Sequence, residues 1–426
     1  MTVYLICYGA SWITAYFHLY YLSGTALMLA AGYLYYYDYH RTGNAIHLRG
    51  LFSAFWVGGQ GIACLKLSRL QTDWSVMTWI CFFLAFAGFW VTFQILERVF
   101  GEEERFDRRR RRQRSFVRPV YYCIIGLTAV SLAAFLLEAA VLGFIPLFLR
   151  GVPHAYSEFH LSGVHYLTVS CVLVPALSVI FFLQGGSRRS VRNVVILLMT
   201  LIAFLIPILC VSRFQLIFAM VLAVFTCCAY QKKVEPWLIG AAVLILIPLY
   251  IVLTVARSHD VSYLNGIFEM KNNKMPIFIS QPYIYIANNY ENFNCLVDAL
   301  PAHTWGIRSL FPVWALTGLK FMFPYLISFP IYVDKEELTT LTMFYDAYYD
   351  FGVIGVLLFA CILGAVCFLL TQRLKDMKNP LEYLFYGQMA IYMMLSFFTT
   401  WFSNPATWFY FGVTLCMMIY CNISRR

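Results

Sequence analysis

Three arginines stand at positions where their side chains suit the binding of phosphate. Arg213, Arg257 and Arg308 each lie beside or within a segment that we expect outside the cytoplasm, and Lys320 follows on the same side. An arginine at the edge of a bilayer is costly unless it pairs with an acid or binds an anion, and its planar guanidinium matches phosphate oxygens. The four cations therefore predict a site for a lipid-linked pyrophosphate. The alternative is anchoring at the membrane surface, or pairing with Asp260, Glu269 or Asp334.

A histidine near the second arginine is the candidate for a general base. His259 follows Arg257 by two residues, and a neutral imidazole can remove a proton from a sugar hydroxyl. His303 and Glu291 are further candidates on the same side, and an exposed loop histidine without a catalytic role is the alternative. The remaining histidines are dispersed, without the i, i+4 spacing of a helical metal pair, so we expect neither a metal nor a cofactor.

One segment of the same region combines tyrosines with amides. Residues 281–292 include five side chains that we expect to contact a glycan, namely Tyr283, Tyr285, Asn289, Tyr290 and Glu291. Aromatic faces pack on the apolar faces of sugar rings, and amides and hydroxyls bind sugar hydroxyls. An interfacial amphipathic helix with a belt of tyrosines is an equal alternative.

Two carboxylates lie four residues apart where the tenth apolar run begins. Asp346 and Asp350 would share one face of a helix at the outer edge of the membrane. They could steer an acceptor sugar, act as a base or balance the charge of the arginines. The alternative is a helix start that is stabilised by acids near its positive end.

The elements that must position these residues are membrane-spanning helices. Of the 426 residues, 61% are hydrophobic and 12% are charged, whereas a soluble domain carries about 25% charged residues. This composition excludes a water-soluble fold. The apolar runs have the length that crosses about 30 Å of hydrocarbon as helix, without the alternation of barrel strands.

The sequence thus predicts an all-α, polytopic integral membrane protein, a single transmembrane domain over residues 1–426, with about twelve transmembrane helices and one large extracytoplasmic loop. The expected spans are roughly 3–22, 24–39, 50–66, 74–97, 119–142, 165–184, 193–211, 214–230, 236–255, 343–370, 381–402 and 405–423. The first two could be one long tilted helix, since only Ser23 and Gly24 separate them. The third is short and rich in glycine, and could be broken or tilted.

Basic residues predict the orientation of the chain. The loop 97–118 contains five consecutive arginines, and every second loop after it is basic. Because short cytoplasmic loops are enriched in Lys and Arg, we expect these loops and both termini in the cytoplasm. The arginine run is interpreted as a determinant of topology among membrane lipids, with anionic-lipid or nucleic-acid binding as the alternative; we expect no nucleic acid partner. The loop 256–341 is long and too apolar for a solvated linker, so we expect helices that lie on the membrane or re-enter it.

Topology and several short motifs resemble the Wzy-type oligosaccharide repeat-unit polymerases, also called O-antigen polymerases. The run Tyr349-Asp350-Phe351-Gly352-Val353-Ile354-Gly355 is similar to their segment at the start of a late helix, and Ser212-Arg213 is similar to their Ser-Arg at the head of a middle helix. Leu48-Arg49-Gly50-Leu51-Phe52-Ser53 and Leu65-Lys66-Leu67-Ser68 resemble some Firmicutes-type members. The resemblance covers the whole chain in topology, and its motifs are short.

The resemblance implies a glycosyltransferase of the bacterial cytoplasmic membrane that needs no metal. It would join repeat units at the outer face with inversion, from a polymer on undecaprenyl pyrophosphate to a hydroxyl of a lipid-linked repeat unit. Arg213, Arg257 and Arg308 match the family's outward arginines by position and would hold the pyrophosphate, while His259 would assist deprotonation. A flippase and a chain-length regulator would be partners. The alternatives are a ligase that transfers a finished glycan, and a flippase or transporter of lipid-linked sugars.

Overall fold

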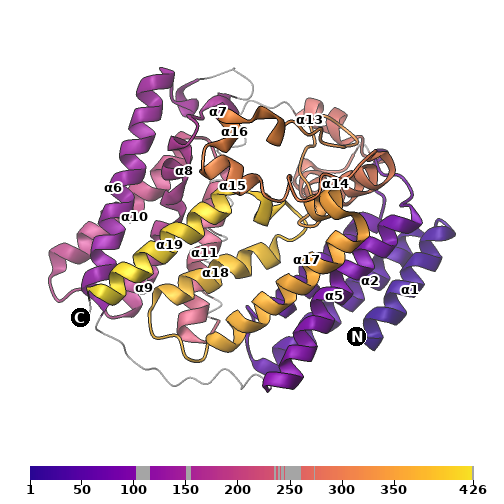
Figure 1. The fold of residues 1–426 in the computed structure, drawn as a ribbon, viewed down its shortest axis with the longest axis horizontal. Coiled ribbons are helices and arrows are strands. Elements are labelled where there is room, and N and C mark those ends of the chain that lie inside the picture. Colours follow the sequence, from indigo (N-terminus) through magenta and orange to yellow (C-terminus); the bar gives the residue numbers. More distant parts are fainter. Residues whose placement is uncertain are drawn as a thin grey trace. The chain divides into compact units, whose positions relative to one another are not determined.

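The computed structural model describes residues 1–101, 116–149, 155–234, 261–272 and 274–424, with residues 237, 240 and 244, and these are helices and loops without a strand (Figure 1). Among them, seven helical segments are long and apolar enough to cross a membrane. They are Val76–Phe100, Val117–Leu142, Val164–Leu183, Ser190–Leu209, Arg213–Gln231, Tyr345–Arg373 and Pro405–Ile423. The prediction of a helical membrane protein is confirmed, whereas the larger number of spans stays a prediction. The arginine run and nearly all of the ninth predicted span lie outside the described residues.

The chain divides into two compact units. Unit 1 comprises residues 1–106, 260–372 and 392–408, and unit 2 comprises residues 107–259, 373–391 and 409–426. Unit 1 begins with two helices, α1 (Thr2–Tyr16) and α2 (Tyr20–Thr42), which pack against each other. His18 between them has a φ of 59°, a left-handed conformation that ends a right-handed helix. The residues expected to form the first two spans are therefore two helices and not one.

The glycine-rich third apolar run is interrupted, as one of the two alternatives from the sequence predicted. It consists of α3 (Leu48–Phe52), the π-helical turn η1 (Ser53–Val57) and α4 (Gly58–Cys64). α4 approaches α2 closely, because a Cβ built on Gly61 would lie 2.8 Å from the Gly24 carbonyl oxygen, and one on Gly24 would lie 2.6 Å from the Gly61 carbonyl oxygen. Small residues allow such backbone contact between membrane helices.

A fully buried arginine joins α2, α3 and the next helix, α5 (Val76–Phe100). The Arg49 Nε lies 3.1 and 3.0 Å from the two carboxylate oxygens of Asp38, and one of its terminal nitrogens lies 3.1 Å from a Glu97 carboxylate oxygen. Arg41 pairs with the other oxygen of Glu97. Because buried charges are costly unless they are paired, two cations against two carboxylates stabilise this end of unit 1. The guanidinium of Arg49 is therefore bound by acids within unit 1.

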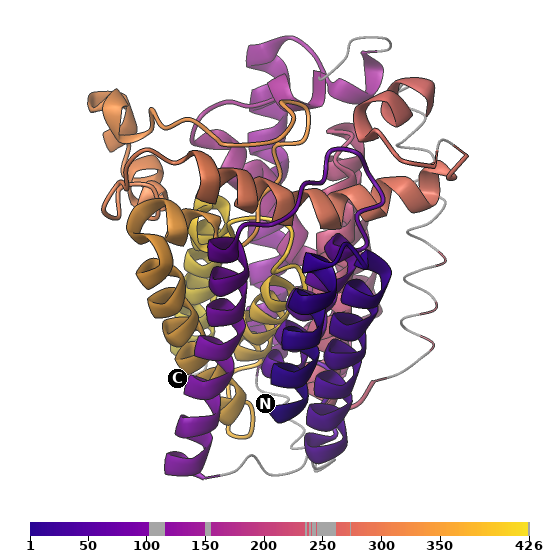
Figure 2. The ribbon, with the colours of Figure 1, turned by 90° about the vertical axis from the view of Figure 1, so that its right-hand side faces the viewer.

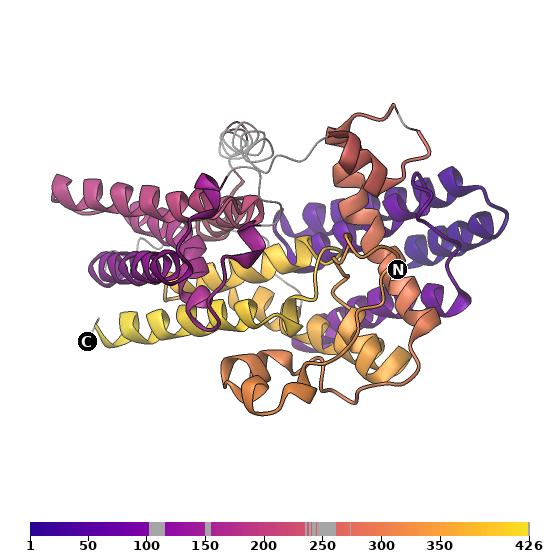
Figure 3. The same cartoon turned by 90° about the horizontal axis from the view of Figure 1, so that it is seen from above.

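Several helices lie within the described part of residues 256–341, the predicted large loop, whose place outside the cytoplasm stays a prediction. α13 (Val261–Phe268) is followed by α14 (Ile277–Ala299), and the short elements α15 (Phe311–Leu316), α16 (Leu319–Met322) and η5 (Pro324–Leu326) come next. α14 lies across the ends of the unit 1 helices and does not run alongside them (Figures 2 and 3). The chain then enters α17 (Tyr345–Arg373), and η6 (Trp401–Ser403) precedes α19. α14 thus covers one end of unit 1.

Unit 2 contains α6 (Val117–Leu142), the stretch α8, η4 and α9 (Val164–Val169, Ser170–Leu173, Val174–Leu183), α10 (Ser190–Leu209) and α11 (Arg213–Gln231). Two short elements, η3 (Pro146–Phe148) and α7 (Ala155–Glu158), follow α6. α18 (Leu381–Met394) and α19 (Pro405–Ile423) contribute residues to both units. The fully buried carboxylate of Glu138 in α6 accepts hydrogen bonds from the Leu161 N–H at 3.0 Å and the Thr168 hydroxyl at 2.7 Å, which attaches α8 and Leu161 before it to α6.

The close crossing of α2 and α4 predicts the effect of a bulkier residue. Gly61→Val would force two backbones apart, at a cost of about 1–3 kcal/mol for overpacking, and should lower the melting temperature of the purified protein in detergent. Gly9→Val on α1 is the matched control, because a Cβ on Gly9 has no neighbour within 4 Å. Equal melting temperatures for the two variants would contradict the close contact.

Candidate functional site

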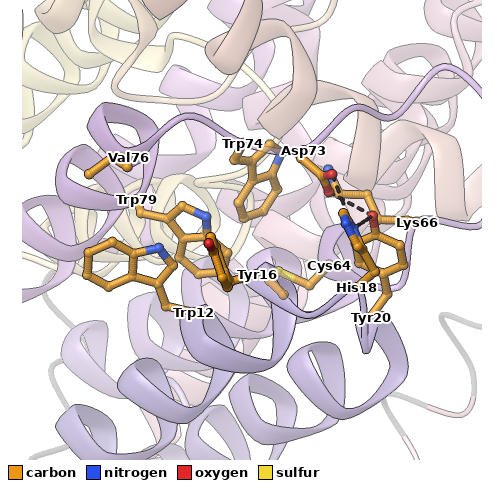
Figure 4. Close-up of a pocket in the computed structure, with 11 residues that line it drawn as sticks. Trp12, Tyr16, His18, Tyr20, Cys64, Lys66, Asp73, Trp74, Val76 and Trp79 are labelled. Atoms are coloured by element: carbon orange, nitrogen blue, oxygen red, sulfur yellow. Dashed lines mark hydrogen bonds and ion pairs between the residues drawn. The ribbon is translucent and has the colours of Figure 1, made fainter.

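A cavity of about 450 Å³ opens in unit 1 where α1 ends and α5 begins. One side of it is aromatic, and the other side carries polar and charged groups (Figure 4). The aromatic side chains that line it are Trp12, Tyr16, Tyr20, Trp74 and Trp79. Large flat apolar faces with polar groups opposite are the surfaces that a sugar ring requires.

The polar side contains a histidine that is oriented by a carboxylate. His18 Nδ1 lies 3.4 Å from an Asp73 carboxylate oxygen and 2.8 Å from the Tyr20 hydroxyl, which donates to the other Asp73 oxygen at 2.8 Å. These acceptors favour the tautomer with the proton on Nδ1, so the Nε2 lone pair is left to accept a proton. The side chains of His18 and Asp73 are 68% and 56% exposed, and an accessible histidine beside a carboxylate can act as a general base.

Lys66 contributes an ammonium group to the same cavity. Its side chain is 6% exposed, and its Nζ donates to the Thr72 carbonyl oxygen and lies 3.4 Å from a Glu291 carboxylate oxygen. The Nζ also lies 4.7 Å from the centre of the Trp74 ring, a cation–π contact. An ammonium group has three protons, so one donor is left for an oxygen of a ligand.

An acid of α14 forms several of the contacts that hold the loop framing the cavity, residues 65–75. The fully buried Glu291 accepts hydrogen bonds from the Thr72 N–H at 2.9 Å, from the Thr72 hydroxyl and from the Trp74 indole N–H at 3.2 Å, besides its ion pair with Lys66. Four contacts satisfy a carboxylate that water does not reach. Glu291 therefore positions both Lys66 and Trp74 in the cavity wall.

Further contacts fix the rest of this loop. The Tyr283 hydroxyl accepts from the Leu67 N–H at 2.8 Å and donates to the Gln71 side chain, and burial raises its pKa. The Asn294 side-chain oxygen accepts from the Ser75 N–H at 3.0 Å. Residues 269–271, which follow α13, pair with residues 67–69, as in the Arg69 N–H to Glu269 carbonyl hydrogen bond of 2.9 Å. The loop is thus attached along its length.

A second polar cluster in unit 1 surrounds Arg308. Its guanidinium forms an ion pair with Asp346 and lies 5.3 and 4.5 Å from the ring centres of Tyr345 and Tyr349. Burial alone would lower the pKa of Arg308, but the Asp346 carboxylate outweighs this and raises it, so the guanidinium stays charged. A phosphate would have to share this arginine with Asp346.

Asp350, the second of the paired carboxylates, organises the backbone of the Arg308 loop. It accepts hydrogen bonds from the Arg308 N–H at 3.2 Å and the Ser309 N–H at 2.7 Å, and from the Thr304 hydroxyl. Gly352 interrupts α17 with φ 61° and ψ −145°, a conformation that is essentially restricted to glycine. Asp346 and Asp350 lie on the same helical segment before this break, as their spacing predicted.

The other predicted glycan residues of α14 lie within the protein. Tyr290 is fully buried and donates to the Trp56 carbonyl oxygen at 2.7 Å. The Asn289 amide is buried and donates to the carbonyl oxygens of Phe397 and Tyr285, both at 2.7 Å. Tyr285 itself is half-buried. Glu291 and Tyr283 of α14 form hydrogen bonds with the 65–75 loop, and this loop lines the cavity.

The predicted pyrophosphate cations are distributed over the chain. Arg308 and Lys320 belong to unit 1, where the Lys320 Nζ lies 5.0 Å from the Phe321 ring centre. Arg213 belongs to unit 2, is the first residue of α11 and has a buried side chain. Arg257 and His259, the predicted catalytic pair, lie outside the described residues. The pyrophosphate assignment therefore stays a prediction.

The sequence reasoning missed the histidine of the cavity because it grouped His18 with the dispersed histidines. The order of the helices places His18 and Asp73 at the same end of the bundle. His18 lies between the first two helices and Asp73 lies between the third and fourth, so both turns fall at the same end of an alternating bundle. The predicted spans 3–22 and 24–39 put the first turn at residue 23, whereas α1 ends at Tyr16 and α2 begins at Tyr20, so the prediction buried His18 inside a span.

No protein-family model, curated protein or solved structure matches this chain. In the part of the chain that the structure describes, no group of three or more His, Cys, Asp or Glu side chains is arranged to hold a metal ion.

The buried Glu291–Lys66 pair predicts a non-additive effect on stability. Glu291→Gln leaves Lys66 buried without its counter-charge, and removal of one partner of a buried pair costs about 3–5 kcal/mol. Adding Lys66→Met should restore part of the lost stability, as measured by thermal unfolding, because it removes the unpaired charge. The single variant should also speed hydrogen exchange at residues 66–75.

Glu269→Gln serves as the control, because Glu269 pairs with Lys335 on the surface, where a pair contributes about 0–1 kcal/mol. The buried pair would be contradicted if Glu291→Gln were as stable as this control. It would also be contradicted if the double variant lost as much stability as the two single variants lose together.

Proposed function

We propose that this protein is a glycosyltransferase that polymerises lipid-linked oligosaccharide repeat units, from undecaprenyl pyrophosphate, at the outer face of the bacterial cytoplasmic membrane. The observation that carries the proposal is the aromatic cavity of unit 1, with His18, Asp73 and Lys66 on its polar side. Its place at one end of apolar helices suits a substrate whose lipid stays in the membrane while its sugars reach water. The resemblance to the repeat-unit polymerases supports the same chemistry.

In this proposal the cavity binds the acceptor sugar. The ring of the sugar packs on the tryptophans, and Lys66 donates to one of its oxygens. The Nε2 of His18 takes the proton of the acceptor hydroxyl as its oxygen attacks the anomeric carbon of the donor. Asp73 then stabilises the imidazolium that forms, in the role of the third member of a triad.

The donor's bond to pyrophosphate breaks as the new glycosidic bond forms, and the pyrophosphate leaves with the bonding electrons. Arginines would offset the charge that grows on it. Arg308 is held in place by Asp346 and two tyrosine rings, and Arg213, Arg257 and Lys320 are the other predicted contacts. No step of this scheme requires a metal.

Replacement of the base tests the proposal. In a strain that lacks the gene, His18→Gln should fail to restore polymer and leave single lipid-linked repeat units, because a general base contributes about 10²–10⁴ in rate. Asp73→Asn should give a partial loss. His40→Gln, an exposed histidine near the other end of α2, is the control and should restore full polymer length when membrane levels are matched.

The same assay separates the alternatives. Polymer that forms normally but is not attached to its final acceptor would identify a ligase. Lipid-linked units that accumulate on the cytoplasmic side would identify a flippase or transporter. If the His18→Gln variant restores polymer of wild-type length, His18 is not the base. The class of enzyme would then be decided by the phenotype of the deletion strain.

A further inference from the structure

We propose that unit 2 contains a binding site for the phosphate headgroup of an anionic membrane lipid. The site is a second cavity, of about 460 Å³, between the start of α6, the end of α9 and the start of α10. It is separate from the acceptor cavity of unit 1 and independent of the proposed catalytic activity. Three arginines line it, namely Arg118, Arg188 and Arg192.

The three guanidinium groups have no carboxylate partner among the described residues. Two of them lie near tyrosine rings, with the Arg192 guanidinium carbon 5.5 Å from the Tyr121 ring centre and that of Arg118 6.0 Å from the Tyr122 ring centre. Three cations that face one cavity repel one another, and a phosphate bound between them would relieve that repulsion. Guanidinium groups bind phosphate oxygens in pairs of parallel hydrogen bonds.

A buried amide shows that this cavity is more than a cluster of surface charges. Gln184 borders it, is 1% exposed, and neither its side-chain nitrogen nor its side-chain oxygen has a hydrogen-bond partner among the residues that the structure describes. An unsatisfied buried amide costs about 1–3 kcal/mol. A headgroup that fills the cavity would give the amide a partner, since its N–H can donate to a phosphate oxygen and its carbonyl can accept from a headgroup hydroxyl.

The loop between α9 and α10 is rigidly shaped around the cavity. The Asn193 side-chain oxygen accepts from the Ser187 N–H at 2.9 Å, and its amide donates to the Ser187 carbonyl at 3.1 Å. Gly186 has a φ of 60°, and a Cβ there would lie 3.1 Å from the Asn193 oxygen. These contacts close the turn that carries Ser187 and Arg188 at the edge of the cavity.

The surroundings favour a lipid over a free phosphate. The cavity lies at the ends of three apolar helices, at the boundary where hydrocarbon would meet water. From there α10 presents a row of exposed apolar side chains, which are Val191, Val194, Leu197, Leu198 and Leu201. Acyl chains could follow this row while the headgroup occupies the cavity. Basic pockets between membrane helices on the cytoplasmic side bind anionic headgroups, and the basic loops of this chain predict that side here.

The test is lipid-dependent thermal stability of the full-length protein in neutral detergent. Phosphatidylglycerol should raise the melting temperature, and phosphatidylcholine should not. Arg188→Gln with Arg192→Gln should weaken the apparent affinity for phosphatidylglycerol by about tenfold or more, as expected for lost charge-assisted hydrogen bonds. Gln184→Leu should weaken it without any change of charge.

Arg189→Gln is the matched control, because Arg189 is an exposed arginine of the same loop that does not line the cavity; it should leave the affinity nearly unchanged. Arg118→Gln provides a second test if the double variant does not fold. Equal stabilisation by the two lipids, or an equal loss from Arg189→Gln, would overturn the site. Stabilisation by inorganic phosphate alone to the same extent would overturn its assignment to a lipid.

Discussion

The structure of unit 1 depends on the burial of one carboxylate. Glu291 has no exposed surface, so it must find its hydrogen-bond donors within the protein. It finds them in a single loop, at Lys66, Thr72 and Trp74. That requirement fixes the 65–75 loop beneath α14, and the loop in turn places an ammonium group and an indole in the wall of the aromatic cavity. Asp73 lies in the same loop, so the orientation of His18 also depends on Glu291.

The same principle recurs around Arg308, where the acids belong to α17. Asp346 neutralises the guanidinium, and Asp350 accepts the backbone N–H groups of Arg308 and Ser309. A break in α17 at Gly352 leaves the carbonyl oxygens of two preceding residues to accept hydrogen bonds from the loop at 304–305. In both places acids shape a loop that presents a cation, which is what a site for sugars and phosphates needs.

Much of the fold could be predicted from the sequence, because apolar length and the absence of alternation determine helical spans. The π-helical turn of the third run lies at Ser53–Val57, before the glycines of α4, so the glycines did not locate it. The spacing of Asp346 and Asp350 did predict that both lie on one helix. The roles of the α14 side chains could not be predicted. A tyrosine or an acid in an amphipathic segment has the same sequence signature whether it faces a ligand or a neighbouring loop, and only the path of residues 65–75 shows that Tyr283 and Glu291 bond to protein. His18 was missed because its partner Asp73 lies far away in the chain.

Photoaffinity labelling would test the central claim most directly. A lipid-linked repeat unit with a diazirine on the sugar that carries the acceptor hydroxyl would be irradiated with the purified protein, and the labelled residues would be mapped by mass spectrometry. The proposed acceptor cavity predicts labels on Trp12, Tyr16, Trp74 or Trp79 that an excess of unmodified repeat unit abolishes. Labels confined to unit 2, or labels on these residues that competition does not reduce, would contradict it.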